Sequence, residues 1–174
     1  MNKTTLAYLA GIMDADGYFS IRKTSWGVRK GKNMVNYQYF IRIGAKQITP
    51  SPAIRLLHET FGGCFREDEP PSCKRGRVLT SWQATDRIAE RAIVALLPFL
   101  KVKKNQAKLL LDLVKYKRRG RKGVFVNKHK DRWGKIITFK NACYSQKQIE
   151  YMENLYTAVR SFNTTNWKLK PLPI

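Results

Sequence analysis

The chain has 174 residues, and 34 Lys and Arg against 12 Asp and Glu give it a formal charge of +22. This length suits one domain with its own core, and so large a positive charge repels itself unless a polyanion neutralises it. Nucleic acid is therefore the expected partner. A membrane is not, because no apolar run approaches the roughly 18–20 residues of a transmembrane helix and no long basic amphipathic helix is present.

A structural zinc site is not expected, because Cys64, Cys73 and Cys143 show no C-x-x-C spacing and the chain has only two histidines. Free thiols are expected, with a Cys64–Cys73 disulfide as the alternative. The first apolar stretch is short and ends in Asp14, which is unlike a signal peptide. We therefore expect an intracellular protein of the cytoplasm or nucleoid, or of an organelle, that is not secreted.

The first predicted helix covers residues 4–15 and ends in two acids and a glycine. Gly17 is expected to take the left-handed conformation that stops a helix, which leaves Asp16 at the helix C-terminus, where the helix dipole is already negative. Small residues at helical spacings of three and four would let a second helix approach closely, and they predict a dimer interface through Ala7, Ala10 and Gly11. Two such helices would bring two carboxylates together, and bound cations would resolve that repulsion.

Alternation with a period of two predicts four strands. One begins at Tyr18, and the other three cover residues 34–47, 64–68 and 77–86. Between them, Ser51 and Pro52 have the residue types of a helix N-cap and first helical position, and a further helix is predicted over 87–97. The order helix, strand, strand, helix, strand, strand, helix predicts an α+β fold. Its four-stranded antiparallel, saddle-like sheet would have helices on one face only.

The other face of this sheet would carry side chains that form hydrogen bonds. They are Ser20, Arg22, Thr24, Gln38, Arg42, Arg66, Asp68, Arg77, Ser81 and Gln83. Such groups read base edges, and a twisted sheet or ribbon can lie in a major groove. An exposed sheet face is polar in many proteins, but the net charge favours contact with double-stranded DNA.

The second half of the chain is strongly basic. Residues 101–140 hold fifteen Lys and Arg and two acids. A helix is predicted up to about Lys117, and residues 118–140 are expected to form a basic loop that contacts phosphates through Arg118, Arg119, Arg121 and Lys122. A last helix, capped by Ser145, would end near residue 163. The whole chain, 1–174, is predicted to be one domain, with a core over about 4–117 on which the basic loop and the last helix pack.

Residues 9–17 read Leu-Ala-Gly-Ile-Met-Asp-Ala-Asp-Gly, which resembles the nonapeptide that names the LAGLIDADG homing endonucleases at seven of nine positions. The resemblance implies an enzyme that hydrolyses DNA with divalent metal ions, which activate a water and stabilise the leaving oxygen. As an order of elements it covers roughly residues 5–117. The basic segment over 118–140 departs from the family pattern, so its role in DNA binding is inferred from charge alone.

The resemblance also implies the roles of residues near the motif. Asp16 would be the metal carboxylate, and the Ala15 carbonyl a second ligand. Mg is the expected metal, with Mn or Ca able to substitute structurally. Asp14 is expected to be structural, at the last turn of the helix.

Two further positions follow from the family pattern. Lys103 lies where the family places a lysine, which can offset the charge that develops on the scissile phosphate. Its lysine-rich surroundings leave a plain phosphate contact as an alternative. The polar residue at the end of the second strand is ambiguous, because residue type favours Gln47 and strand parity favours Lys46.

A single motif per chain implies a homodimer that reads a near-palindromic site. The main hypothesis is a site-specific, Mg-dependent DNA endonuclease, encoded within a mobile intron, that cuts both strands with short staggered ends. The alternative is an intron RNA-binding maturase of the same fold, with or without cleavage. A non-catalytic basic protein, such as a ribosomal or transcription factor, is a third hypothesis.

Overall fold

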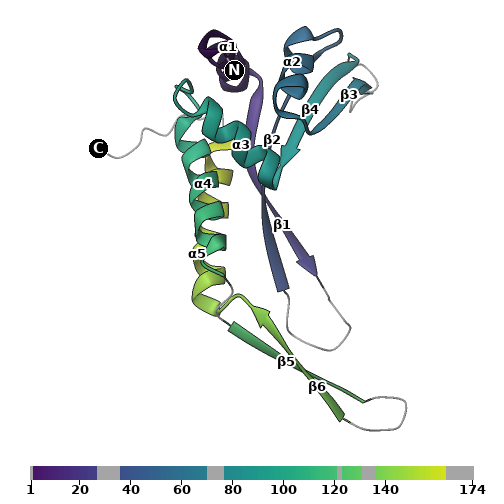
Figure 1. Ribbon diagram of the computed structural model, residues 1–174, viewed down its shortest axis with the longest axis vertical. Helices are drawn as coiled ribbons and strands as arrows, with labels where there is room; N and C mark the ends of the chain where they lie inside the picture. The colour runs from purple at the N-terminus through teal and green to yellow at the C-terminus, as the bar shows by residue number, and fades with distance from the viewer. Residues whose placement is uncertain (1, 27–35, 70–76, 121–122, 131–135, 164–174) are drawn as a thin grey trace.

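The structure is a computed structural model that describes residues 2–26, 36–69, 77–120, 123–130 and 136–163. Figure 1 shows its helices and strands. Their bounds are α1 Lys3–Ala15, β1 Gly17–Trp26, β2 Asn36–Ile48, α2 Pro52–Phe61, β3 Cys64–Glu69, β4 Leu79–Thr85, α3 Asp86–Leu96, α4 Lys104–Arg118, β5 Gly123–Lys130, β6 Ile136–Cys143 and α5 Gln146–Asn163. In these ranges, no helix is long and apolar enough to cross a membrane.

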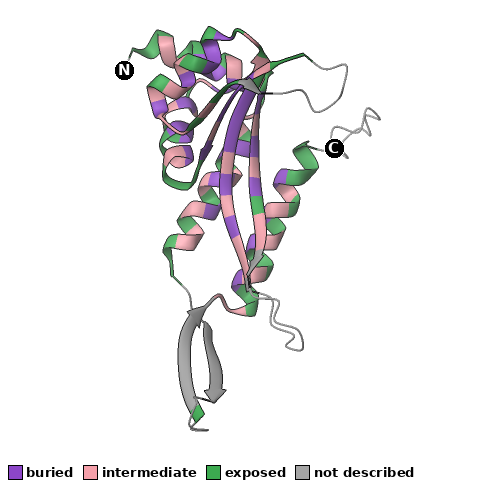
Figure 2. Cartoon of the chain, turned by 90° about the vertical axis from the view of Figure 1, so that its right-hand side faces the viewer, coloured by how far each residue is buried: buried purple, intermediate pink, exposed green. Residues whose placement is uncertain are grey.

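The predicted α+β architecture is confirmed. The first seven elements follow the order αββαββα, and four strands form one antiparallel sheet in the order β1-β2-β4-β3. The helices pack on one face of this sheet, and the fully buried side chains between the two layers include Phe19, Tyr39, Ile43 and Trp82. Figure 2 looks onto the sheet, along whose strands buried residues alternate with less buried ones. The buried residues face the helices, and the second face of the sheet has no covering layer of helices.

The predicted cap of α2 is also confirmed. Ser51 has extended backbone angles and accepts a hydrogen bond from the Ile54 N–H at 3.3 Å, and Pro52 occupies the first helical turn. At the other end, Gly62 and Gly63 have φ angles of +76° and +104°, which glycine adopts without steric cost. The Trp82 indole donates to the Gly62 carbonyl at 2.7 Å, so the end of α2 is joined to the sheet.

The segment that we expected to be a basic loop differs from the prediction. Residues 123–130 and 136–143 form strands β5 and β6, which pair antiparallel as a separate two-stranded sheet. Figure 1 shows this hairpin beyond the ends of α4 and α5, away from the four-stranded sheet. The hydrophobic core between the four-stranded sheet and its helices therefore does not order β5 and β6. Residues 27–35, 70–76, 121–122, 131–135 and 164–174 lie outside the described residues.

Helix α5 contributes Met152, Leu155 and Val159 to the core. At its start, the Ser145 N–H donates to Gln148 Oε1 at 3.0 Å and the Gln148 N–H donates to Ser145 Oγ at 3.4 Å, which is a capping box. Cys64 is an exposed free thiol, as expected, and Cys73 lies outside the described part of the chain.

Candidate active site and nucleic-acid interface

Asp16 is the C-cap of α1 and is exposed at the negative end of the helix dipole. Its N–H donates to the Ile12 carbonyl at 2.8 Å. Gly17 follows, but its predicted left-handed conformation is wrong, because positive φ angles occur instead at Gly62, Gly63 and Gly120. Gly17 is required for a different reason: a Cβ there would lie 2.6 Å from the Met13 carbonyl oxygen. The chain therefore turns sharply from α1 into β1 and leaves Asp16 at the corner.

Two consecutive side-chain hydrogen bonds hold the Asp16 carboxylate. Gln47 Nε2 donates to Asp16 Oδ2 at 2.6 Å, and Ser51 Oγ donates to Gln47 Oε1 at 2.6 Å. Because Ser51 holds the amide oxygen, the amide nitrogen faces the carboxylate. Lys46 lies on the opposite face of β2, where it is paired with Ser81 of β4. The two residues that the sequence left as alternatives are thus separated by the sheet, and Gln47 is the one that reaches Asp16.

Lys103 lies just before α4, and its side chain reaches the same corner. Its Nζ donates to three carbonyl oxygens at the end of α1 and the start of β1: Met13 at 3.1 Å, Ala15 at 3.2 Å and Gly17 at 2.6 Å. Burial lowers the pKa of Lys103, while the negative charges of Asp14 and Asp16 act against that shift. The structure therefore brings three of the predicted residues together, namely Asp16, Gln47 and Lys103.

Asp14 binds the backbone at the start of α4. Its carboxylate accepts backbone N–H bonds from Lys101 at 2.7 Å, Val102 at 3.2 Å and Lys103 at 2.9 Å. A carboxylate with three such donors already uses much of its capacity to accept hydrogen bonds. This geometry agrees with the structural role expected for Asp14, and it explains how the backbone of Lys103 is placed next to α1.

The donor set at the corner suits a hard divalent cation. The exposed Asp16 carboxylate and the exposed Ala15 carbonyl are both oxygen ligands, which Mg and Ca prefer. The Lys103 ammonium already lies against the Ala15 carbonyl, so this position favours positive charge. In the described part of the chain, no group of three or more His, Cys, Asp or Glu side chains could hold a metal ion. One protomer therefore offers part of a coordination shell, and further oxygen ligands would have to come from water, phosphate or a second chain.

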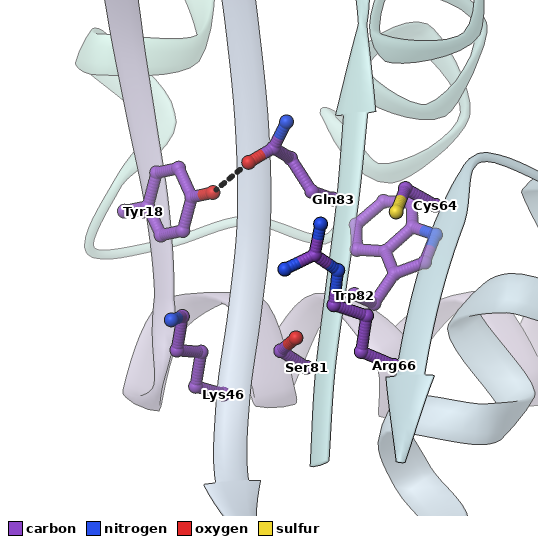
Figure 3. A pocket seen from close by; sticks show the side chains of 7 residues that line it. All are labelled: Tyr18, Lys46, Cys64, Arg66, Ser81, Trp82 and Gln83. Atoms are coloured by element: carbon purple, nitrogen blue, oxygen red, sulfur yellow. Dashed lines mark hydrogen bonds between the residues drawn. The ribbon is translucent and has the colours of Figure 1, made fainter. Parts of the chain in front are cut away.

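The uncovered face of the sheet carries rows of polar side chains that cross the strands. One row pairs Ser20 with Arg42 and Thr85, the next pairs Tyr18 with Gly44, Gln83 and Cys64, and a third pairs Lys46 with Ser81 and Arg66. The last two rows surround a hollow of about 140 Å³, which Figure 3 shows. Lys46 lines it, on the face where strand parity placed it. Tyr18 and Cys64 also line it and were not predicted at this face, although strand parity with Ser20 and Arg66 would have found them.

The remaining predicted contact residues of the sheet differ in their surroundings. Arg22 and Arg77 are exposed, and Thr24 and Gln38 are paired on β1 and β2, where the Thr24 hydroxyl donates to the Gln38 carbonyl. Ser81 is 7% exposed, so it forms the floor of the hollow and not its rim. The Asp68 side chain lies outside the described residues.

The predicted contacts of the basic segment are placed differently. Arg118 forms an ion pair with Glu90 of α3 at 2.7 Å, and the Arg119 guanidinium lies 5.5 Å from the Tyr116 ring centroid. Both arginines belong to the layer of helices and not to the polar face of the sheet. Arg121 and Lys122 lie outside the described residues.

The predicted helix interface needs one correction. Ala10 is fully buried in the core of its own chain, so it is not available to a partner. Ala7 and Gly11 are exposed, and a Cβ built on Gly11 would meet nothing within 4 Å. The exposed stripe on α1 consists of Thr4, Ala7, Tyr8, Gly11 and Ala15.

No protein-family model matches the sequence, and no curated protein matches it significantly. Solved structures do match the fold. The homing endonuclease I-CvuI, in complex with the I-CreI target in 2 mM Mg with the DNA not cleaved, has a TM-score of 0.62 at 21% identity, over 98% of this chain and 88% of that chain. This chain has the LAGLIDADG homing endonuclease fold.

Two further structures with the LAGLIDADG fold support this assignment. I-CvuI bound to its own target in 2 mM Ca has a TM-score of 0.61 at 21% identity, over 97% of this chain and 87% of that chain. The LAGLIDADG homing endonuclease I-SmaMI, bound to cleaved DNA, has a TM-score of 0.51 at 12% identity over 100% of this chain. This chain covers 52% of I-SmaMI and most of I-CvuI, so its length corresponds to that of the I-CvuI chain.

Proposed function

We propose that this protein is a site-specific double-stranded DNA endonuclease that acts as a homodimer with Mg. The observation that carries the proposal is the corner after α1. There an exposed Asp16 carboxylate is held by Gln47 at 2.6 Å, and Lys103 reaches the same turn of backbone, next to a polar and basic sheet face. The solved structures that share this fold include homing endonucleases bound to DNA targets, which supports DNA as the substrate.

In this proposal each residue at the corner has a separate task. Asp16 and the Ala15 carbonyl would hold the divalent ion, which supplies activation of water and stabilisation of the leaving oxygen when it is bound. Gln47 fixes the orientation of the Asp16 carboxylate, and Ser51 fixes Gln47 in turn. Lys103 places a positive charge where negative charge develops on the phosphate. Asp14 holds the backbone that carries Lys103.

We propose a homodimer because one chain supplies a single Asp16 carboxylate. A single Asp16 can serve one strand, whereas cutting both strands needs two such carboxylates related by a two-fold axis. The exposed stripe on α1 includes the small residues Ala7, Gly11 and Ala15, which would allow two copies of that helix to pack closely and bring the two Asp16 side chains near one another. A two-fold symmetric dimer would read a near-palindromic site, with the polar face of each sheet over one half-site.

A two-stage selection tests this proposal without a known target. The protein would first be incubated with duplexes of random sequence without Mg, and bound duplexes would be amplified and sequenced. Selected duplexes would then be incubated with Mg. We expect enrichment of a near-palindromic sequence, and then cuts in both strands with short staggered ends.

The variant Asp16→Asn should bind the same sequence but cut it at least a hundredfold more slowly, because removing a principal group of a hydrolytic site usually costs this much. Asp112→Asn is the matched control, because Asp112 is exposed on α4 and takes no part in the hydrogen bonds at the corner. Undiminished cleavage by folded Asp16→Asn protein would refute the role of Asp16. Enrichment of RNA but not of duplex DNA in a parallel pool would instead indicate an intron RNA-binding maturase.

A further inference from the structure

One hydrogen bond on the polar sheet face crosses a whole strand. Tyr18 lies on β1 and Gln83 on β4, with β2 between them in the sheet. Tyr18 Oη nevertheless donates to Gln83 Oε1 at 3.3 Å, and Figure 3 shows the dashed line of this hydrogen bond passing over β2. Neighbouring strands are about 4.8 Å apart, so this contact links side chains about twice that distance apart at the backbone.

Gly44 makes the crossing possible. It is paired with Tyr18 on one side and with Gln83 on the other. A Cβ on Gly44 would lie 2.6 Å from Tyr18 Oη and 2.5 Å from the Trp82 carbonyl oxygen, so any side chain there would occupy the place of the tyrosine. The Arg42 guanidinium lies 5.3 Å from the centroid of the Tyr18 ring and packs against it. The ring is therefore held in position from the strand that it crosses.

The bond decides which way the Gln83 carboxamide faces. A free glutamine can rotate its amide to present either an acceptor oxygen or a donor nitrogen. Here a hydroxyl that donates holds the oxygen, and Figure 3 shows the amide nitrogen pointing away from Tyr18. Gln83 is only partly buried, so this nitrogen belongs to the accessible face of the sheet.

We infer that Tyr18 is a positioning residue for sequence recognition, which fixes Gln83 as a hydrogen-bond donor toward a major-groove base edge that offers an acceptor. This inference rests on the proposed DNA-binding function. Guanine, adenine and thymine each offer an acceptor in the major groove, whereas cytosine offers a donor. Gln83 in its fixed orientation therefore discriminates against cytosine at the base position that it faces. An amide free to rotate would accept a hydrogen bond from the cytosine amino group.

The test compares sequence profiles from the random-duplex selection for four proteins: the wild type, Tyr18→Phe, Gln83→Ala and the double variant. Tyr18→Phe keeps the ring and removes the hydroxyl. We expect cytosine to become about tenfold more frequent at one symmetric pair of positions, because one hydrogen bond typically controls that much discrimination. Gln83→Ala should alter the same positions, and the double variant should match Gln83→Ala because both changes act through one amide.

Tyr151→Phe is the matched control, because it removes the same hydroxyl from α5, where the ring packs against Tyr116. It should leave the profile unchanged. If Tyr18→Phe gives the wild-type profile at every position, the inference is overturned and the proposed function stays intact. Failure of the folded wild type to enrich any duplex would refute the proposed function and the inference with it. Because Gln83→Ala needs no change at Tyr18, the position that Gln83 reads is identified even when Tyr18→Phe folds poorly.

Discussion

At the scale of single residues, the two acids of the opening motif do different work although they are two positions apart. Successive residues of a helix point about 100° apart, so Asp14 and Asp16 leave α1 in different directions. Asp14 faces the start of α4 and accepts three backbone N–H bonds. Asp16 lies past the last turn and meets Gln47 in an exposed corner. The same residue type thus serves the fold at Asp14, whereas at Asp16 it stays exposed, as the proposed metal role requires.

This division predicts that substitutions at the two acids differ in their effect on the free energy of unfolding. Asp14→Ala should lower the free energy of unfolding by about 1–3 kcal/mol, because it leaves backbone donors without their acceptor. Asp16→Asn should change it by less than about 0.5 kcal/mol, as exposed substitutions usually do. Chemical denaturation of both variants beside the wild type measures the difference. Equal destabilisation by the two substitutions would contradict the assignment of Asp14 to structure.

The choice between Gln47 and Lys46 shows where residue-level prediction stopped. Parity along β2 placed Lys46 on the uncovered face, and that placement is correct. Strand parity alone does not locate the end of α1 relative to β2. The last turn of α1 leaves the covered side open beside Gln47, so a residue that faces the helices still meets the exposed Asp16. The contact of Ser51 with Gln47 is local in the chain, because the turn between β2 and α2 places the helix cap next to the strand end.

At the scale of elements, α5 is tied to the sheet by a half-buried charge. The Tyr39 hydroxyl and the Lys23 ammonium both donate to Glu153, and the ammonium lies 4.1 Å from the centroid of the Tyr37 ring. Burial alone would raise the pKa of Glu153, but the hydrogen bonds from Lys23 and Tyr39 and the charge of Lys23 outweigh it, so this pKa lies below its ordinary value. The ionised form is therefore bound more tightly in the folded state.

The lowered pKa gives this contact a defined pH dependence. Its contribution is fully present above the ordinary glutamate pKa of about 4.3, and it is lost as the pH falls through the lower pKa of the folded state. Glu153→Gln should therefore cost about 1 kcal/mol at neutral pH, a value reduced for solvent screening, and much less near pH 3. Urea denaturation from pH 7 to pH 3 measures this, with Glu150→Gln, exposed one turn earlier on α5, as the control. A constant difference across that range would exclude the charge as the cause.

The elements themselves were largely predictable, with one informative exception. The strands of the four-stranded sheet alternate apolar and polar residues because one face is covered, and this pattern predicted them. Strands β5 and β6 belong to a separate two-stranded sheet away from that core. Their sequences therefore carry no clear alternation, and the excess of lysine and arginine there suggested a loop. A charge count records composition and says little about backbone conformation.

At the scale of the whole molecule, the site is incomplete in one chain. The corner after α1 offers one carboxylate and one carbonyl to a cation, and the described residues contain no cluster that would complete the shell. The sequence predicted a close helix interface, but it counted Ala10 in it because spacing alone does not separate the two sides of a helix. The core of the chain covers Ala10, and only the stripe with Ala7 and Gly11 remains for a partner.

That stripe predicts a substitution that separates folding from assembly. Gly11→Leu places a large side chain where a Cβ meets nothing within 4 Å, and leucine favours a helix over glycine by about 0.8 kcal/mol, so the single chain should unfold at a slightly higher temperature. The same side chain would prevent two α1 helices from approaching closely. Sedimentation velocity should then show the 20.2 kDa protomer instead of a species of twice that mass, and cleavage of both strands should be lost.

The control is Lys108→Leu, which introduces the same leucine side chain at an exposed position of α4, away from α1, and should leave the dimer intact. A Gly11→Leu protein that still sediments as a dimer would place the interface elsewhere, and the pairing of two Asp16 carboxylates would have to be abandoned.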